Sequence, residues 1–414
     1  MKVFVDRIGA RGDGIAVTEG GSIYIPDALP GEWVRIGKIK HRRGVARAEV
    51  RELLEASPAR VTPGCFHYNK CGGCVGQHLG KELYAAWKQE HVERVLLRAG
   101  LKAQVLPVLF VPIGSRRRVR MEFRVVGDET LLGFREAGSA WIVDVNDCIV
   151  ATAGIVGVLP ILRQFLPRFG GEGWVSVTEL SNGLDVVVSS QDQPDMNLRM
   201  DAAAFCAEAG VSRLSWANRK GQTEPILIID QPIVWFADAS VAPPPLCFLQ
   251  PTAQGETELR NFVLEAMGGS EKVVDLYAGC GAFALPLAAE GKSIHAVEAV
   301  VAQAEAINSS ASKRSTTIEV RDLWRQPLQA VELDRFDAVI IDPPRAGAAP
   351  QINQLAISSV PSIVYVSCNP VTFARDALLL LNGGYKIGPV QPVDQFVWSH
   401  HIELMAQFTR IAGK

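Results

Sequence analysis

Cys368 lies in a Ser-Cys-Asn-Pro segment, directly after an apolar run, residues 363–367, that has the composition of a β-strand. Asn369 and Pro370 form a turn signal, after which a helical pattern begins. The sequence therefore predicts a parallel strand that ends at Cys368, at the edge where open α/β sheets bind their ligands. A thiol presented there is a candidate nucleophile, although an isolated cysteine is most often a small buried hydrophobic residue.

Two acidic motifs accompany this cysteine in the chain. Asp342 is followed by Pro343-Pro344-Arg345, and Glu403 closes the segment His-Ile-Glu. Asp342 ends a predicted strand, residues 337–342, and the two prolines fix the direction of the chain after it. Read alone, Glu403 is a surface carboxylate on a late strand. Together, the two motifs favour the reading of Cys368 as a nucleophile.

A glycine-rich turn follows another predicted strand, residues 272–277. Asp275 lies near the end of that strand, and Gly279 and Gly281 allow a ligand to lie against the backbone. Glu298 ends the next predicted strand, where an acid can accept hydrogen bonds from ribose hydroxyls. This arrangement predicts a nucleotide-like ligand.

The spacing of this turn leaves two ligands open. Gly279, Gly281 and Ala284 satisfy the looser G-x-G-x-x-A pattern of dinucleotide sites, so NAD is one candidate. The position of Asp275 before the turn fits S-adenosylmethionine better. Asp322 is then a candidate for binding the adenine side of that donor.

Three cysteines, Cys65, Cys71 and Cys74, follow one another as C-x5-C-G-G-C. The two glycines permit a tight turn in which two thiolates face one centre. Cys148 is the expected fourth ligand, and Cys206 is its rival. A disulfide framework is not expected in a cytosolic protein, whereas zinc and a four-iron cluster both accept four thiolates. The spacing does not separate these two metal centres.

The composition describes a globular protein of 414 residues, 48% hydrophobic and 21% charged, with room for two or three domains. No apolar run reaches the length of a membrane span, and the N-terminus lacks the apolar core of a signal peptide. We therefore expect a soluble cytoplasmic protein. The net charge of −2 does not by itself indicate a nucleic-acid-binding protein.

The pattern of strands and helices divides the chain into three predicted domains. Residues 1–55 contain five short strands separated by glycine and proline turns, which is typical of an OB-like β-barrel that grips nucleic acid. Residues 56–245 hold the cysteines, a predicted helix over 82–99 and a strand-rich α/β region. Residues 246–414 alternate strands and helices, the signature of a doubly wound, mostly parallel sheet.

Basic residues gather in two places. Within the second cluster, Arg118, Arg120 and Arg124 share one face of a predicted strand with Glu122. Both clusters are read either as solvated surface or as contacts to RNA phosphates, which supply affinity without sequence choice. The first cluster consists of Lys38, Lys40, His41, Arg42, Arg43 and Arg47, and the second begins with Arg116 and Arg117.

Taken together, these segments resemble the uracil-5 RNA methyltransferases. Within that family they are most similar to the branch that modifies 23S ribosomal RNA and carries an N-terminal TRAM domain and a four-iron cluster. The resemblance covers nearly the whole chain, and two positions, Thr252 and Ala282, depart from the common pattern. The matching segments are 9–31, 248–250, 275–283, 342–345, 367–370 and 401–403, together with the four cysteines.

The resemblance implies a fold and two cofactors. The expected fold is a TRAM-like RNA-binding barrel, a central α/β domain with an iron–sulfur cluster, and a Rossmann-like class I methyltransferase domain. The cofactors are S-adenosylmethionine and a [4Fe-4S] cluster, whose ligands are Cys65, Cys71, Cys74 and Cys148. The donor-binding residues are Gln250, Tyr277, Glu298, Asp322 and Asp342, and Asp342 is also expected to recognise or orient the uracil.

The resemblance also implies a mechanism. Cys368 is expected to add as a thiolate to carbon 6 of uracil, which makes carbon 5 nucleophilic enough to accept a methyl group. Glu403 is expected to remove the carbon-5 proton, and the pKa of Cys368 is expected to be lowered. The target base is expected to be flipped out or single-stranded. The cluster is expected to brace the central domain or to touch RNA.

Alternative functions remain at this point. The expected substrate is 23S rRNA, with tRNA as the second choice, and a monomer is expected. A non-catalytic RNA-binding protein would explain the barrel and the arginines but not the pair Cys368 and Glu403. A radical S-adenosylmethionine enzyme would need C-x3-C-x2-C and an open iron site, whereas the spacing here is C-x5-C-x2-C.

Overall fold

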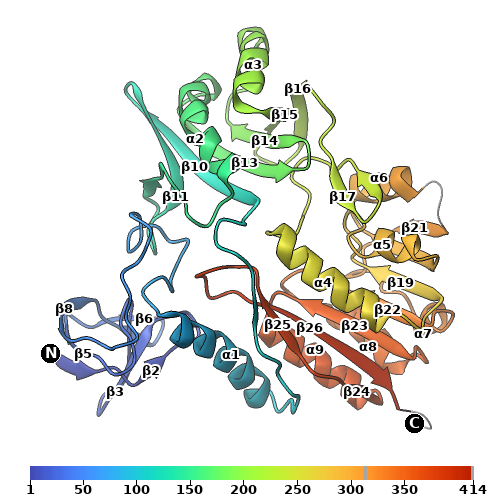
Figure 1. Cartoon of the computed structure of the whole chain (residues 1–414), viewed down its shortest axis with the longest axis horizontal. Helices are drawn as coiled ribbons and strands as arrows, with labels where there is room; N and C mark the ends of the chain where they lie inside the picture. The colour runs from blue at the N-terminus through green and yellow to red at the C-terminus, as the bar shows by residue number, and fades with distance from the viewer. Residues whose placement is uncertain (312–314, 412–414) are drawn as a thin grey trace.

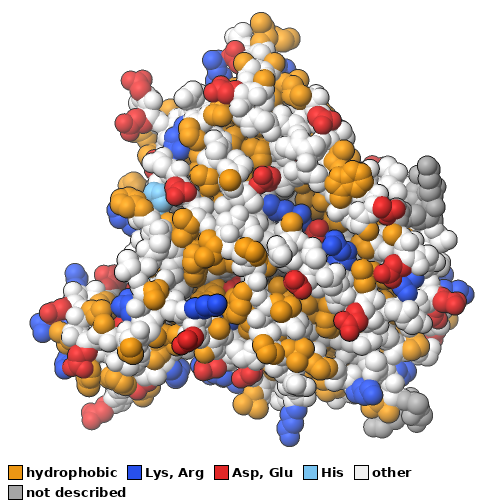
Figure 2. Space-filling model, in the orientation of Figure 1, with side chains coloured by type: hydrophobic (Ala, Val, Ile, Leu, Met, Phe, Trp, Pro, Cys, Tyr) orange, Lys and Arg blue, Asp and Glu red, His pale blue; other side chains and the backbone are white. Residues whose placement is uncertain are grey.

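The computed structural model describes residues 1–311 and 315–411. Figure 1 shows an N-terminal β-rich unit at the lower left, a central α/β unit at the top, and a large C-terminal sheet with its helices at the lower right. Figure 2 shows charges of both signs interspersed over this face. Within the described residues, no helix is long and apolar enough to cross a membrane.

The C-terminal sheet carries the segments of the candidate site. Its strands lie in the order β21, β20, β19, β22, β23, β26, β25 and β9, with β24 beside β26. The strands from β21 to β23 run parallel, and β26 is antiparallel to β23, which confirms the predicted mostly parallel sheet. The bounds are β9 (Leu109–Phe110), β19 (Lys272–Leu276), β20 (Ser293–Glu298), β21 (Thr316–Val320), β22 (Ala338–Ile341), β23 (Ser362–Ser367), β24 (Tyr385–Ile387), β25 (Gln391–Asp394) and β26 (Glu403–Arg410).

Alternate residues of these strands pack into two hydrophobic cores, one on each face of the sheet. Val274 and Leu276 pack with α1, α8 and α9, whereas Val273 packs with α4, α5 and α6. Both faces are covered, and this explains why the central strands are apolar throughout. The bounds are α1 (Lys81–Arg98), α4 (Ala253–Ala266), α5 (Ala284–Ala289), α6 (Val301–Ala311), α7 (Ala330–Leu333), α8 (Ala349–Ile357) and α9 (Pro370–Asn382).

The helix predicted over residues 82–99 forms as α1, and it packs on the C-terminal sheet beside α9 rather than within the central unit. Lys88 of α1 is almost fully buried. Its Nζ contacts Oδ1 of Asp394 at 3.0 Å and donates to the carbonyl of His401 at 2.6 Å. Because Asp394 and His401 lie at the two ends of the loop between β25 and β26, α1 anchors that loop.

The N-terminal β-unit, residues 2–55, consists of two small sheets around one apolar core. Strands form near all five predicted positions, and the structure adds β2, β6 and β8. One sheet is β1 (Lys2–Phe4), β5 (Trp33–Ile36) and β8 (Val50–Glu55). The other is β2 (Arg7–Ile8), β3 (Gly14–Thr18), β4 (Gly21–Ile25), β7 (Val45–Arg47) and β6 (Lys40–Arg42). Its identity as a TRAM barrel stays a prediction.

The central unit is a sheet in the order β12, β11, β10, β13, β14, β15 and β16, covered by two helices that share its core. A short hairpin, β17 (Val234–Phe236) and β18 (Ala239–Val241), follows it. The bounds are β10 (Arg118–Val126), β11 (Glu129–Arg135), β12 (Ile142–Asp144), β13 (Glu172–Leu180), β14 (Gly183–Ser190), β15 (Val211–Ala217), β16 (Thr223–Ile228), α2 (Ala153–Phe165) and α3 (Met196–Ala209).

Candidate active site

Cys368 lies between a strand and a helix, where the sequence placed it. β23 ends at Ser367, and α9 begins at Pro370. The side chain of Asn369 caps this helix by accepting a hydrogen bond from the amide of Val371 at 3.1 Å. The thiol is half-buried. It therefore lies at the carboxyl edge of the sheet, beside a helix N-terminus whose backbone dipoles favour a thiolate.

The register of two antiparallel strands brings Glu403 to this thiol. Ser367 pairs with Leu404, so the same register places Cys368 across from Glu403 at the end of the pair. Glu403 is 3% exposed. Burial raises its pKa well above the usual range, and the charge of Asp342 raises it further. A buried carboxylate with a raised pKa is a competent proton acceptor once it is ionised.

The pKa of Cys368 is raised to about 12, which is opposite in direction to the prediction. Burial is the largest cause, followed by the negative charges of Glu403 and Asp342, and together they outweigh the favourable charge of Arg345. The prediction of a lowered pKa is therefore wrong for this pocket. The physical reason is that burial disfavours the charged thiolate, and that two carboxylates close to the sulfur oppose a further negative charge.

Two glutamines connect the carboxylates of the site. Nε2 of Gln250 donates to Oδ2 of Asp342 at 3.2 Å, and Oε1 of Gln250 accepts from Nε2 of Gln395 at 2.8 Å. The same nitrogen of Gln395 donates to Oε2 of Glu403 at 3.0 Å. Burial raises the pKa of Asp342 to about 7. Both carboxylates are therefore oriented by one hydrogen-bonded chain of four side chains.

Gln395 is a site residue that the sequence did not reveal. It is 1% exposed and follows the last residue of β25, Asp394. Its Oε1 is buried without a hydrogen-bond partner and faces Gly255 of α4, where a Cβ would lie 2.5 Å from that oxygen. The sequence offers little signal here, because β25 reads Gln-Pro-Val-Asp and does not have the apolar composition of the central strands.

Asp275 of β19 is fully buried, and neither of its carboxylate oxygens has a hydrogen-bond partner. Burial raises the pKa of Asp275 well above its usual range, and the charges of Asp342 and then Glu298 raise it further, while the backbone amide of Ala284 lowers it. A buried carboxylate without a partner is costly. The site therefore fits a ligand that brings hydrogen-bond donors or positive charge to this strand end.

The glycine-rich turn after β19 has the predicted open backbone. Gly279 and Gly281 have φ values of +56° and +91°, in the left-handed region that favours glycine. Oε2 of Glu298 accepts from the amide of Gly279 at 2.9 Å, and its Oε1 accepts from the amide of Val300 at 2.8 Å. The carboxylate of Glu298 is thus held at the turn, where the sequence expected it to meet a ribose.

Tyr277 and Asp322 lie near each other at the same edge. Tyr277 has a φ of +63°, and its hydroxyl is buried without a partner. Burial raises the pKa of Tyr277, and the charge of Asp322 raises it further. Asp322 accepts a hydrogen bond from the amide of Trp324 at 3.0 Å. Of the predicted donor-binding residues, Tyr277, Glu298 and Asp322 therefore lie near the turn, and their role in binding the donor stays a prediction.

A family model described as tRNA (uracil-5-)-methyltransferase matches residues 244–410. A protein of Caulobacter vibrioides named as an RNA methyltransferase is 40% identical, in an alignment that covers 98% of this chain and 99% of that protein. A 23S rRNA (uracil(1939)-C(5))-methyltransferase RlmD of Shewanella amazonensis is 32% identical, with 98% and 94% covered. This chain belongs to the RNA uracil-5 methyltransferase family.

The fold of this uracil-5 methyltransferase matches a solved relative. The structure of a tRNA (uracil-54, C5)-methyltransferase from Pyrococcus abyssi, in complex with S-adenosyl-L-homocysteine, superposes with a TM-score of 0.77 over 99% of each chain at 23% identity. At that identity the likeness establishes the fold. The C-terminal sheet is thus the predicted class I methyltransferase fold, and family membership supports S-adenosylmethionine as the methyl donor.

The predicted cluster ligands of the methyltransferase line one cavity of about 480 Å³. These residues are Cys65, Cys71, Cys74 and Cys148, all free thiols. Burial raises the pKa of Cys74 to about 12, and the charges of the other three add to the effect. Cys206 lies in the core of the central sheet and is not among the lining residues.

The metal centre itself is not confirmed. Within residues 1–311 and 315–411, no group of three or more His, Cys, Asp or Glu side chains is placed to hold a metal ion. A single zinc ion needs thiolates about 2.3 Å from its centre, so the sulfurs must converge on one point.

The second basic cluster of the methyltransferase is largely used within the protein. Nη2 of Arg117 lies 2.5 Å from Oε2 of Glu256, and its Nε donates to the carbonyl of Gln250 at 3.0 Å. Arg118 donates to the carbonyl of Leu246 at 3.3 Å. These arginines hold the segment that carries Gln250 against β10, so their first role is to position the active site.

Proposed function

We propose that this uracil-5 methyltransferase transfers a methyl group from S-adenosylmethionine to carbon 5 of a uridine in 23S rRNA. The observation that carries the proposal is the strand register that sets Cys368 across from Glu403. The reaction needs a nucleophile at carbon 6 and a base at carbon 5 of one ring, so the two groups must face the same small space. The choice of 23S rRNA is supported by the similarity to the Shewanella amazonensis enzyme over the whole chain.

In the first step Cys368 loses its proton to a neighbouring carboxylate or to water. Its thiolate adds to carbon 6 of uracil, which forms a carbon–sulfur bond and an enolate. The enolate electrons at carbon 5 then form a bond to the donor methyl group, and the bond between that methyl and the sulfonium sulfur breaks to leave S-adenosylhomocysteine. The raised pKa of Cys368 makes loss of the thiol proton a demanding part of this sequence.

In the second step Glu403 removes the proton from carbon 5. The electrons of that carbon–hydrogen bond re-form the double bond between carbons 5 and 6, and the bond from carbon 6 to Cys368 breaks. Gln395 holds the carboxylate of Glu403 by donating to Oε2, and this hydrogen bond favours the ionised, basic form. Asp342, held by Gln250, orients the uracil ring by accepting its N–H.

The donor site is acidic, and the donor is a cation at its sulfonium and amino groups. Asp275, Glu298, Asp322 and Tyr277 surround the turn after β19, and the oxygens of Asp275 and Tyr277 still lack partners. A bound cation would satisfy these oxygens and would also lower the pKa of the nearby thiol. Donor binding therefore favours the thiolate of Cys368 at the moment when it is needed.

We propose that the cysteine cavity holds the [4Fe-4S] cluster. The donor set fits, since four thiolates are the usual ligands of such a cluster and the backbone amide of Gly73 already donates to Sγ of Cys71 at 3.4 Å. Phe396 and His401, in the loop that leads to Glu403, line the same cavity. The cluster would therefore brace that loop.

The cluster is tested by anaerobic purification. The protein should be brown with about four irons, and Cys148→Ser should lower the iron content. A colourless protein with stoichiometric zinc would refute the cluster.

The test of the function is methyl transfer to RNA by the purified full-length protein. Labelled S-adenosylmethionine is incubated with 23S rRNA, with tRNA and with a 23S rRNA in which 5-methyluridine is already present. We expect label as 5-methyluridine in unmodified 23S rRNA and none in the other two. Label found only in tRNA would show that tRNA, and not 23S rRNA, is the substrate. Absence of label from all RNAs, with intact donor binding, would favour a non-catalytic RNA-binding protein.

A further inference from the structure

The loop that precedes Glu403, the proposed base, is held by a helix from a distant part of the chain. This loop, residues 395–402, joins β25 to β26, and Gln395 at its start donates the hydrogen bond that holds Glu403. The helix is α1, and its contacts to the loop come from Tyr84 and Lys88. The side chain of Lys88 is 1% exposed. Lysine is rarely buried so completely without a paired charge, so its environment here is informative.

Asp394, the last residue of β25, supplies the paired charge. Its Oδ1 lies 3.0 Å from Nζ of Lys88 and accepts from the amide of Phe396 at 3.3 Å. Its Oδ2 accepts from the hydroxyl of Tyr84 at 2.5 Å. The carboxylate is fully buried, and donors from α1 and from the loop occupy both of its oxygens. The backbone that leads into Gln395 is therefore fixed in position.

The far end of the loop is held by the same two side chains. Nζ of Lys88 donates to the carbonyl of His401 at 2.6 Å, two residues before Glu403. The hydroxyl of Tyr84 accepts from the amide of Trp398 at 2.7 Å. Trp398 has a φ of +57°, in the left-handed region that a bulky residue rarely adopts, and such a conformation persists only where the surrounding contacts fix it. One amine of α1 therefore connects both ends of the loop.

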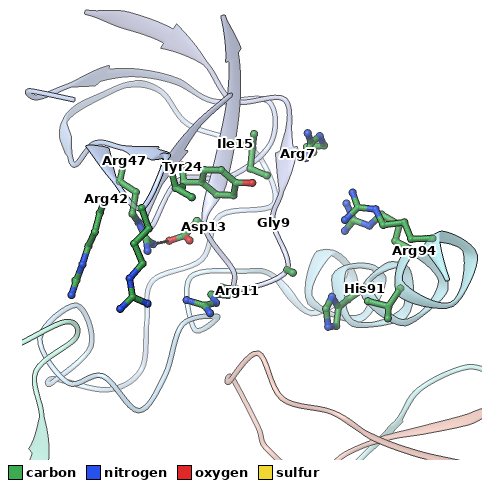
Figure 3. A pocket seen from close by; sticks show the side chains of 15 residues that line it. Arg7, Gly9, Arg11, Asp13, Ile15, Tyr24, Arg42, Arg47, His91 and Arg94 are labelled. Atoms are coloured by element: carbon green, nitrogen blue, oxygen red, sulfur yellow. Dashed lines mark hydrogen bonds and ion pairs between the residues drawn. The ribbon is translucent and has the colours of Figure 1, made fainter. Parts of the chain in front are cut away.

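The helix that carries this amine is itself held on two sides. Nε1 of Trp87 in α1 donates to the carbonyl of Gly9 at 2.9 Å, and Trp87 packs with Ile8 and Leu29 of the N-terminal β-unit. We call the hollow between α1 and this unit, which seven arginines line, the arginine cleft (Figure 3). Val92 of the same helix packs in the core of the C-terminal sheet. The buried amine thus projects from a helix that cannot shift without breaking two apolar contacts.

Stability alone does not explain the buried pair of Lys88 and Asp394. Two charges that are buried together lose their hydration, and their attraction offsets this cost only in part. Apolar side chains of similar size are therefore often as stable or more stable in such a place. What the pair does provide is a defined arrangement of the chain on either side of it. The residue that it places is Gln395, and the carboxylate that Gln395 orients is that of Glu403.

We propose that Lys88 is a positioning residue for the step in which Glu403 removes the proton from carbon 5. It acts through Asp394 and Gln395, and the inference rests on the proposed function for the role of the base. Addition of Cys368 and transfer of the methyl group precede this step, so they do not depend on Lys88. Without the amine, the carboxylate is less well oriented toward carbon 5 and proton removal slows. The bond from Cys368 to carbon 6 then persists, because it breaks only when that proton leaves.

The test follows the two steps separately in a single turnover. The RNA carries tritium at carbon 5 of its uridines, and the donor carries a labelled methyl group. Release of tritium reports proton removal, and transfer of the methyl label reports the earlier step. The variant is Lys88→Met, Asp394→Asn, which removes both charges and leaves no buried charge unpaired. We expect tritium release to be about tenfold slower than in the wild type and methyl transfer to stay within about twofold. A methylated protein–RNA adduct should accumulate on a denaturing gel.

The matched control is Lys292→Met, because Lys292 is also a buried lysine. Its Nζ donates to the carbonyl of Ser270 at 2.9 Å, before β19, and not to the loop. Both rates should equal those of the wild type. Tyr84→Phe replaces the charge variant if that variant does not fold, since it removes only the hydroxyl that bonds to Asp394 and Trp398. It should also slow tritium release more than methyl transfer.

A structural role for Lys88 would give a different result. Loss of folded protein reduces the fraction of active enzyme, which lowers the amplitude of both signals and leaves the ratio of their rates unchanged. An unchanged ratio in both the charge variant and Tyr84→Phe would overturn the proposal. Absence of methyl transfer by the wild type would contradict the proposed function and, with it, this inference. The wild type therefore tests the chemistry, and the variants test the positioning.

Discussion

The active-site pocket and the arginine cleft use charge in opposite ways. In the pocket, Asp275, Asp342 and Glu403 are buried, and burial is the main reason why their pKa values rise; the charge of Asp342 raises the pKa values of Asp275 and Glu403 further. In the arginine cleft, the hollow between the N-terminal β-unit and α1 that seven arginines line (Figure 3), most of the guanidinium groups are exposed and form no ion pair with a described carboxylate. Buried, coupled groups change protonation state readily, whereas solvated cations do not. The first arrangement suits proton transfer, and the second suits attraction of an anionic ligand.

The sharpest test of the pocket is removal of its nucleophile. Cys368→Ala should reduce methyl transfer below about 10⁻³ of wild type, because no other group can add to carbon 6. Binding of S-adenosylmethionine, measured by calorimetry, should persist, since the donor residues lie on other strands. Cys206→Ala, in the core of the central sheet, is the matched control and should retain methylation. Turnover within tenfold of wild type in Cys368→Ala would remove this residue from the role.

Glu403→Gln should stop turnover at a later stage. Glutamine keeps the shape of the side chain and loses its basicity, so Cys368 can still add and the methyl group can still transfer. The product cannot leave, and a denaturation-resistant protein–RNA adduct that carries the methyl group should accumulate on a gel. The double variant Cys368→Ala, Glu403→Gln should form none. Normal turnover without an adduct would point to another base, with Asp342 examined first.

The pH dependence should follow the carboxylates and the thiol. The pKa of Cys368 is raised to about 12 and that of Asp342 to about 7, so the deprotonated forms become scarcer as pH falls. The single-turnover rate should therefore rise between about pH 6 and pH 9. In Glu403→Gln one negative charge beside the sulfur is absent, and adduct formation should shift to lower pH. A rate that is flat over this range would contradict the charge coupling.

Gln395→Leu should have a smaller effect, because it removes a hydrogen bond and leaves the reacting groups in place. Without the donated hydrogen bond the ionised form of Glu403 is less favoured, so we expect about a tenfold lower rate and a pH profile displaced upward. Gln407→Leu is the control, since Gln407 of β26 bonds to Ala266 and Ser362 away from the pocket. A loss of rate with no displacement of the pH profile would mean that Gln395 only supports packing.

Salt should affect ligand binding differently in the two regions, and the smaller change is expected at the pocket. Raising the salt concentration weakens phosphate contacts in the exposed cleft, while the buried pocket is shielded from ions. RNA binding should fall steeply with salt, and binding of S-adenosylmethionine should change by less than about twofold. Equilibrium binding measures the Kd for RNA and for S-adenosylmethionine at each salt concentration. Equal salt dependence of the two Kd values would contradict the expected difference between the regions.

Several elements were readable in the sequence because local patterns specify them. The strands β19, β20, β22 and β23 form where apolar, β-branched runs end at Asp275, Glu298, Asp342 and Cys368 or within a residue of them. Parallel strands buried on both faces must be apolar, and their polar ends must meet at one edge. The helix α1 also follows its pattern, although its buried Lys88 does not fit an amphipathic reading.

Other features had no local signal. The pKa of Cys368 is raised first by burial and then by two carboxylates that arrive from distant segments, and the sequence analysis predicted the opposite direction. Gln395 becomes a site residue only because β25 lies next to β26. The two basic clusters looked alike, yet Arg117 is bound to Glu256 and most arginines of the cleft are unpaired.

The sequence by itself determined which chemistry is available: a thiol, a late glutamate, an acidic strand end before a glycine turn, and four cysteines. These are short-range features, since residue type and neighbours decide them. The tertiary structure decided which of these groups meet, because strand register and helix packing join residues that are far apart in the chain. Register placed Cys368 across from Glu403, and the packing of α1 against the N-terminal β-unit made two sets of arginines into one cleft.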